Sequence, residues 1–174
     1  MLILGIDPGL LLTGYGVIEF KAQRPVLVDG GVIRLTAGAT IISRLVELEA
    51  ELEALFDEHK PEVCAVEQLY AHYAHPRTAI LMGHARGVIL LVAGKRGVPF
   101  QEFAANRVKQ SVVGHGHASK GQVQRAVQAV FHLPALPEPP DVADALAVAL
   151  CCGSYLQRPR AMQVKTRKPA RAKA

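Results

Sequence analysis

Four acidic residues occupy positions in the sequence from which their side chains could converge on one site. Asp7 ends the first apolar run of the chain and precedes a Pro-Gly turn, and Glu67 ends a second apolar run. Asp141 and Asp144 lie three positions apart at the start of an Ala-rich helical segment. Carboxylates without His or Cys are the ligand set of a hard cation such as Mg²⁺ or Mn²⁺, and not of zinc. Two such ions can hold the attacking and leaving oxygens of a phosphodiester displacement.

Each of these acids also has a plain structural interpretation. Asp7 can start a turn by accepting hydrogen bonds from nearby backbone N–H groups. Asp141 can stabilise the positive N-terminal end of its helix. A pair of carboxylates on one face of an otherwise apolar helix fits this interpretation less well, because Asp141 and Asp144 would repel each other unless a cation lay between them.

Basic residues should border an acidic site that acts on nucleic acid, because they hold the flanking phosphates. The candidates for DNA binding are Arg107, Lys109, Lys120 and Arg125. His115 and His117 precede Lys120 in a Gly-rich loop. They are open to three interpretations: a transition-metal pair, a phosphate contact or a plain exposed loop.

The acids must be positioned by a sheet. Residues 2–7, 13–20 and 26–35 are predicted strands joined by short connections, which favours an antiparallel meander. A helix opened by Thr40 or Ser43 runs to about His59 and precedes a buried strand at 63–66. The strand-helix-strand order favours a parallel strand beside the first one, so Asp7 and Glu67 should be neighbours at one sheet edge.

The remaining elements are predicted as a helix over 78–95, a strand over 98–102, and helices over 106–113, 119–132 and from Pro140 onward. The small residues Gly83, Ala85 and Gly87 in the first of these helices would permit close packing. Gly30-Gly31 indicates a bulge or a close approach. The glutamates between Glu47 and Glu53 are interpreted as a solvated helix face.

Composition favours one domain of ordinary size, residues 1–157, followed by a basic tail, residues 158–174. Seven of the 20 Lys and Arg residues follow Gln157, but none of the 15 Asp and Glu residues does. We expect this tail to be disordered, either touching nucleic acid or serving as a solubilising terminus. The three cysteines have neither disulfide-framework nor zinc spacing, and no signal peptide or membrane span is expected. These features predict a cytoplasmic protein with no membrane partner.

Several separate motifs, in unbroken order over residues 2–152, closely resemble the RuvC family of bacterial Holliday-junction resolvases. The segments that carry the resemblance are Asp7-Pro8-Gly9, Thr13-Gly14-Tyr15-Gly16, Ala65-Val66-Glu67-Gln68, Gly83 to Gly87, Val108 to Gly114, Lys120 to Gln124 and Asp141 to Ala147.

The resemblance implies an α/β fold of the ribonuclease H-like kind, with a five-stranded mixed sheet flanked by helices on both faces. It implies a homodimer whose subunits nick opposing strands of four-way junction DNA during recombination and repair and leave ligatable 5′-phosphates. It also implies that the quartet of acids binds two Mg²⁺ ions per subunit, for which Mn²⁺ can substitute. Lys109 and Lys120 match DNA-contacting positions, and Tyr70 matches an aromatic that stacks on a base. A RuvA–RuvB branch-migration complex is the implied partner.

The turn after Gly9 departs from the family pattern. Leu10, Leu11 and Leu12 stand where the family has a small hydroxyl residue and a basic residue. This puts the local DNA contacts in question, but not the acids. The alternative function is a nucleotide-binding domain of the actin and sugar-kinase kind, because Asp7-x-Gly9 followed by Thr13-Gly14 also begins their first phosphate loop. That class needs two such domains, and no second phosphate-loop segment is present.

Overall fold

The computed structural model describes residues 1–21, 24–69 and 76–157. The predictions for Tyr70 and for the tail, residues 158–174, lie outside this part of the chain. Along the chain the elements are β1 (Leu2–Asp7), β2 (Leu12–Lys21), β3 (Arg24–Arg34), α1 (Ile41–His59), β4 (Val63–Glu67), α2 (Pro76–Lys95), β5 (Phe100–Phe103), α3 (Ala105–Val113), α4 (Lys120–Phe131) and α5 (Pro140–Leu156).

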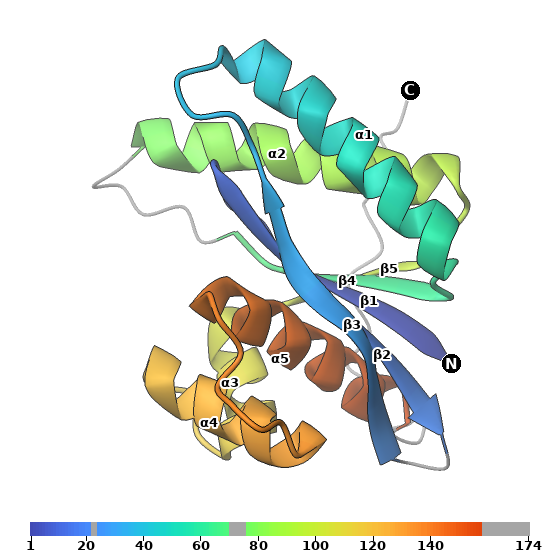
Figure 1. Cartoon of the computed structure of the whole chain (residues 1–174), viewed down its shortest axis with the longest axis vertical. Coiled ribbons are helices and arrows are strands. Elements are labelled where there is room, and N and C mark those ends of the chain that lie inside the picture. Colours follow the sequence, from blue (N-terminus) through green and yellow to red (C-terminus); the bar gives the residue numbers. More distant parts are fainter. Residues whose placement is uncertain (22–23, 70–75, 158–174) are drawn as a thin grey trace, which may run out of the picture.

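The strands form one five-stranded mixed sheet in the order β3-β2-β1-β4-β5. Strands β1, β2 and β3 form the predicted antiparallel meander, while β4 pairs in parallel with β1 and β5 in parallel with β4. Helices α1 and α2 cover one face of the sheet, and α3, α4 and α5 cover the other (Figure 1). This arrangement confirms the predicted fold class.

The sheet has an apolar core on each face because its strand side chains alternate. Ile3 of β1 packs with α5 on one face, whereas Leu4 of the same strand packs with α1 and α2 on the other. Helix α5 is the central helix of its face: from Val142 to Gly153 every residue is buried except Asp144. A helix buried on nearly all sides is a rigid support for the residues at its N-terminus.

Glycines in the sheet let α5 lie unusually close to the strands. A Cβ atom on Gly5 would overlap the backbone of α5 at Ala145 and Ala149, and one on Gly14 would overlap the carbonyl of Asp141. Only glycine gives this clearance, because any larger residue would push the helix away from β1 and β2. The glycines therefore fix the height of the α5 N-terminus above the sheet.

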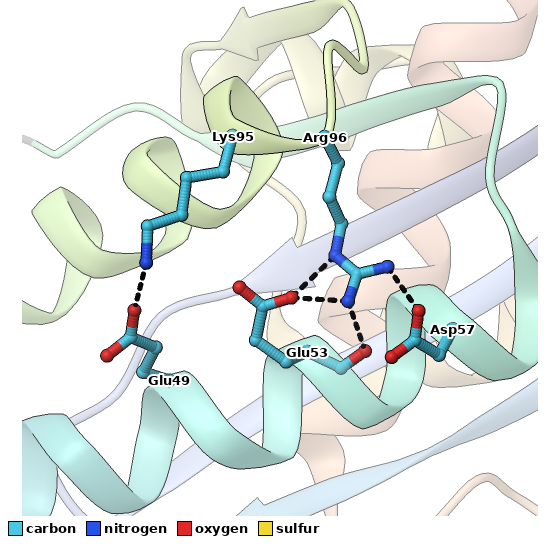
Figure 2. Close-up of polar contacts among 5 residues, drawn as sticks. All are labelled: Glu49, Glu53, Asp57, Lys95 and Arg96. Atoms are coloured by element: carbon cyan, nitrogen blue, oxygen red, sulfur yellow. Dashed lines mark hydrogen bonds and ion pairs between the residues drawn. The ribbon is translucent and has the colours of Figure 1, made fainter.

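On the opposite face, ion pairs tie α1 to the end of α2 (Figure 2). Lys95 Nζ lies 2.6 Å from Glu49 Oε1. Arg96 pairs with both Glu53 and Asp57, and its Nε lies 2.6 Å from Glu53 Oε2. Glu49 and Glu53 remain partly exposed, at 36% and 31%, but the sequence did not indicate which basic residues would pair with them.

The strand boundaries differ from the prediction where backbone chemistry intervenes. Strand β5 begins at Phe100 and not at Val98, since Pro99 has no N–H to donate to a ladder. The β2–β3 irregularity lies between Val17 and Ile18, opposite the residues before Gly30. At Gly31 the structure shows the predicted close approach, because a Cβ there would lie 2.8 Å from the hydroxyl oxygen of Tyr15.

The helix starts follow the predicted caps. Thr40, one of the two candidates, caps α1 by accepting a hydrogen bond from the backbone N–H of Ser43. Ser119 and Gln122 form the predicted capping box at the start of α4. Of the small residues that would permit close packing on α2, Ala85 is buried in the core, whereas nothing in the described chain lies within 4 Å of a Cβ built on Gly83 or Gly87.

Candidate active site

Asp7 and Glu67 stand side by side at the carboxyl edge of the two central strands. Strands β1 and β4 run in parallel, and Ile6 of β1 is in register with Val66 of β4. The next residue on each strand is therefore an acid, and both acids lie where the apolar core ends. The predicted juxtaposition of Asp7 and Glu67 follows directly from this register.

The N-terminus of α5 is brought to the same edge by Gly14. Gly14 is the antiparallel partner of Asp7 on β2, and its missing side chain leaves room for the backbone of Asp141. Asp144 follows about one turn later, on the same side of the helix. Its side chain is only 19% exposed and is the one polar interruption of the buried segment.

Asp7 is the most strongly perturbed acid of the group. Burial, followed by the negative charges of Glu67, Asp144 and Asp141, raises the pKa of Asp7 from 3.8 to about 7, although Lys120 opposes the shift. A carboxylate with this environment is short of positive charge. Three separate elements, β4, α5 and α4, contribute to that environment, which places their charged groups around Asp7.

Two of the predicted lysines reach this acidic edge. The ammonium nitrogen of Lys120 lies 3.2 Å from Asp144 Oδ2, and Asp144 is the main reason that the pKa of Lys120 is raised. Burial raises the pKa of Glu67, and Asp144 adds to this effect, whereas Lys109 and Lys120 oppose it. Lys109 on α3 and Lys120 at the start of α4 therefore flank the acids.

The turn between β1 and β2 is held by two residues to which the sequence analysis gave no role. The Thr13 hydroxyl accepts a hydrogen bond from Gly9 N and donates one to Gly9 O, both at 3.3 Å. Arg44 of α1 donates from Nη1 to the carbonyl of Leu10 at 3.0 Å. Thr13 stood inside a recognisable motif, but Arg44 carried no signal because its role depends on a contact between distant elements.

A cavity of about 880 Å³ opens beside the acids. Asp7, Glu67 and Asn106 line it together with apolar residues that include Ala79 and Met82 of α2. One side of the cavity thus carries charge and the other is apolar. Asn106 and the start of α2 carried no sequence signal that tied them to the site.

The other predicted site residues lie apart from the acids. The guanidinium of Arg107 stacks on Phe103 and Tyr155, near the C-terminal end of α5. Arg125 is exposed on α4, and no interaction joins it to the acids among the contacts of the described chain. His115 and His117 are exposed, which favours the plain-loop interpretation over a metal pair.

The donor set at the sheet edge fits a hard divalent cation. Every acid that surrounds Asp7 offers carboxylate oxygens, and the charge of Lys120 only partly offsets the effects that raise the pKa of Asp7. Within the residues that the structure describes, no three His, Cys, Asp or Glu side chains lie close enough together to hold a metal ion as they stand. The Lys120 ammonium instead pairs with Asp144. The site is thus acidic and open, with a lysine beside one of its carboxylates.

Comparison with known proteins supports the family indicated by the motifs. The family model for crossover junction endodeoxyribonuclease RuvC matches residues 3–152. The chain is 49% identical, over 154 residues, to the crossover junction endodeoxyribonuclease RuvC of Rhodopirellula baltica, a match that covers 88% of this chain and 86% of that protein.

Solved structures agree with this assignment. Thermus thermophilus RuvC in complex with Holliday junction substrate superposes with a TM-score of 0.83 at 32% identity, covering 90% of this chain and 94% of that one. The Thermus thermophilus RuvC structure gives 0.81 at 33% identity, covering 90% and 95% of the two chains. These matches do not favour the actin and sugar-kinase alternative. The chain belongs to the RuvC family of crossover junction endodeoxyribonucleases.

Proposed function

We propose that this nuclease resolves four-way DNA junctions by divalent-metal-dependent hydrolysis, with Asp7, Glu67, Asp141 and Asp144 as its metal ligands. Membership of the RuvC family implies dependence on a divalent metal. The observation that supports the proposal most is the half-buried Asp7, whose pKa is raised to about 7 by desolvation and by the three acids around it. A buried group of like charges is costly unless a cation is bound there.

The donor chemistry favours two Mg²⁺ ions per subunit, with Mn²⁺ as a substitute. When bound, such ions supply activation of water and stabilisation of the leaving 3′ oxygen. The role of the chain is to hold the carboxylates in place. Strands β1 and β4 fix Asp7 and Glu67, and the clearance at Gly14 fixes Asp141.

Lys109 and Lys120 are proposed to hold the phosphates that flank the cut. Both lie close enough to the acids to oppose the pKa rise of Glu67. The Lys120 side chain is 68% exposed, so it can leave Asp144 and turn toward DNA when metal neutralises that carboxylate. Binding of junction DNA is supported by the related Thermus thermophilus structure, which contains a Holliday junction substrate.

A cleavage assay tests the proposal directly. Full-length protein with Mg²⁺ should introduce symmetric nicks into opposing strands of a synthetic four-way junction, and ligase should reseal the 5′-phosphate ends. Asp7→Asn should abolish cutting but retain junction binding. Cutting at the wild-type rate by Asp7→Asn would exclude the acidic edge as the active site.

The exposed face of α2 supports the proposed homodimer. Ile80 and Leu91 are 60% and 51% exposed, and Gly83 and Gly87 lie between them on the same side of the helix. Residues Arg77–Lys95 have a mean hydropathy of 1.3, so by length and composition the helix also meets the test for a membrane span. The core helix of a soluble protein can have the same length and composition, and Arg86 in the middle of α2 pairs with Glu102 of β5. A second copy covering this face would bury the apolar residues.

The oligomeric state can be measured by light scattering during gel filtration. The wild-type chain should elute as a dimer, and Gly87→Glu should elute as a folded monomer that no longer makes paired nicks. A monomeric wild type, or a fully dimeric Gly87→Glu, would contradict the use of this face. Ala54→Glu, at an exposed position on α1, adds the same charge away from α2 and should remain a dimer.

Three finer expectations remain part of this proposal. In recombination and repair, the protein would bind a RuvA–RuvB complex that presents the junction to it. The three buried cysteines favour a reducing compartment such as the cytoplasm. The basic tail, which lies outside the described residues, remains a candidate for contact with nucleic acid.

A further inference from the structure

Arg107 is held in an unusual position for a residue predicted to contact DNA at the active site. Its guanidinium carbon lies 4.7 Å from the ring centroid of Tyr155 and 5.4 Å from that of Phe103. Stacking engages the flat faces of a guanidinium and leaves its N–H groups, which point outward in the plane, available as donors. No carboxylate pairs with this guanidinium in the part of the chain that the structure describes.

A separate cavity of about 210 Å³ lies against Arg107. It is lined by Arg107, Gln110, Ser111, Cys151, Ser154 and Tyr155. The Gln110 amide and the Ser154 hydroxyl therefore join the guanidinium, whereas the Ser111 hydroxyl already donates to the carbonyl of Val108 at 2.7 Å. Among the described residues that line the cavity, none is acidic. The volume corresponds to about seven water molecules at ~30 Å³ each, which is room for a hydrated phosphate group.

We propose that this cavity, the Arg107 pocket, is a second anion site that binds a tetrahedral oxyanion. The shared chemistry is a phosphate group, supplied either by the DNA backbone or by free inorganic phosphate. The aromatic rings orient the guanidinium, and the Ser154 and Gln110 side chains complete the hydrogen bonds to the oxygens.

The position of the pocket fits a phosphate in the same DNA arm as the cut. Ser154 lies ten residues after Asp144 on α5, so the two are about 15 Å apart along the helix axis. At ~3.4 Å per nucleotide along one strand, this distance corresponds to about four or five nucleotides. For the DNA source, the inference rests on the proposed function. For free phosphate, it stands independently.

The DNA source is tested by the salt dependence of junction binding. Fluorescence anisotropy would be recorded over a NaCl series without divalent metal, in an Asp7→Asn background that does not cut. Adding Arg107→Gln should lower the slope of log Kd against log salt by roughly 0.9, the effect of one lost phosphate contact. Arg24→Gln removes the same charge from an exposed residue at the start of β3 and should leave the slope less affected.

A second variant separates anion binding from packing. Ser154→Glu places a negative charge in the pocket but leaves the stacked rings intact, so it should reproduce the slope change even if Arg107→Gln unfolds. Gln157→Glu adds the same charge at the end of α5, outside the pocket lining, as the matched control.

The free-phosphate source is tested by the melting temperature in added inorganic phosphate, compared with chloride at equal ionic strength. If phosphate raises the melting temperature of the wild type but not that of Ser154→Glu, the pocket binds free oxyanions. If the variants change the slope of log Kd against log salt for junction binding, the pocket binds a backbone phosphate. The absence of both effects would overturn the inference. Because Mg²⁺-dependent junction cutting by the wild type is measured separately, failure here is distinguishable from failure of the proposed function.

Discussion

Two groups of acidic residues, one along α1 and one at the edge of β1 and β4, differ in how far cationic side chains compensate their charge. Along α1, Glu49, Glu53 and Asp57 are matched by Lys95 and Arg96 (Figure 2), and a hydrogen bond from Arg96 lowers the pKa of Asp57. At the edge of β1 and β4, burial and neighbouring acids instead raise the pKa of Asp7 to about 7. Acids that stabilise a fold have cationic partners, whereas partly buried acids whose mutual repulsion is only partly offset by cations are candidates for binding a ligand cation.

The largest expected difference between the two groups is in cleavage. Glu67→Gln removes a proposed metal ligand and should lower the rate of junction cutting at least about 10³-fold, a loss of about 4 kcal/mol in transition-state stabilisation. Glu53→Gln makes the same change within the α1–α2 network and should leave the rate within about twofold. Single-turnover cleavage measures both rates. Equal losses in the two variants would remove the functional distinction between the groups.

The next effect is on stability in the absence of metal. Because the folded-state pKa of Asp7 lies above its ordinary value of 3.8, the folded protein holds this proton more tightly than the unfolded chain. The contribution of Asp7 to stability should therefore decline as pH rises from about 4 to about 7, by up to about 4 kcal/mol.

Asp7→Asn removes this titration. In EDTA, urea unfolding at a series of pH values should show a smaller decline for the variant than for the wild type, and the variant should be the more stable protein at pH 8. A wild type that becomes more stable relative to Asp7→Asn across this pH range would contradict the assigned electrostatics.

A third effect concerns the packing that positions Asp141. Gly14→Ala places a methyl group against the carbonyl of Asp141 and should cost about 1–3 kcal/mol of unfolding free energy as α5 shifts. Cleavage should fall as well, because the acids would no longer align. Gly94→Ala, where nothing lies within 4 Å of the added methyl, should be neutral or stabilising by up to about 1 kcal/mol. Full activity in a destabilised Gly14→Ala would show that the close approach is purely structural.

The smallest effect is expected in the α1–α2 network. Arg96→Gln removes the partner of Glu53 and Asp57, but these groups are largely solvated, so the melting temperature should fall by only a few degrees. Cleavage should be unchanged. This loss should shrink further at high salt, and a strong effect on cutting would mean that the network reaches the active site.

The acidic edge was predictable from sequence because its geometry follows from local signals. Each of the two strands is an apolar run whose last residue is an acid, so the sequence marks where the strand ends. The order of strand, helix and strand predicts that β1 and β4 are parallel, as they are. Pro140 marks the start of α5, where Asp141 lies. These features depend on neighbouring residues and on general rules of sheet topology, and the resemblance to a family added their joint role.

The features that could not be predicted depend on packing between distant segments. Arg107 precedes Lys109 by two residues, yet it faces Phe103 and Tyr155 while Lys109 faces the acids. The contact of Arg44 with the turn at Leu10 joins residues 34 positions apart. Sequence spacing shows that such residues lie on a helix, but not which neighbour each side chain meets.

Direct measurement of metal binding tests the central claim, that the four acids at the sheet edge hold divalent ions. Mn²⁺ would be titrated into the wild type and into Asp7→Asn, Glu67→Gln and Glu53→Gln, with bound ions counted by electron paramagnetic resonance. The account predicts two ions per subunit in the wild type and in Glu53→Gln, and weakened or lost binding in Asp7→Asn and Glu67→Gln. Unchanged Mn²⁺ binding in both of the latter variants would contradict it.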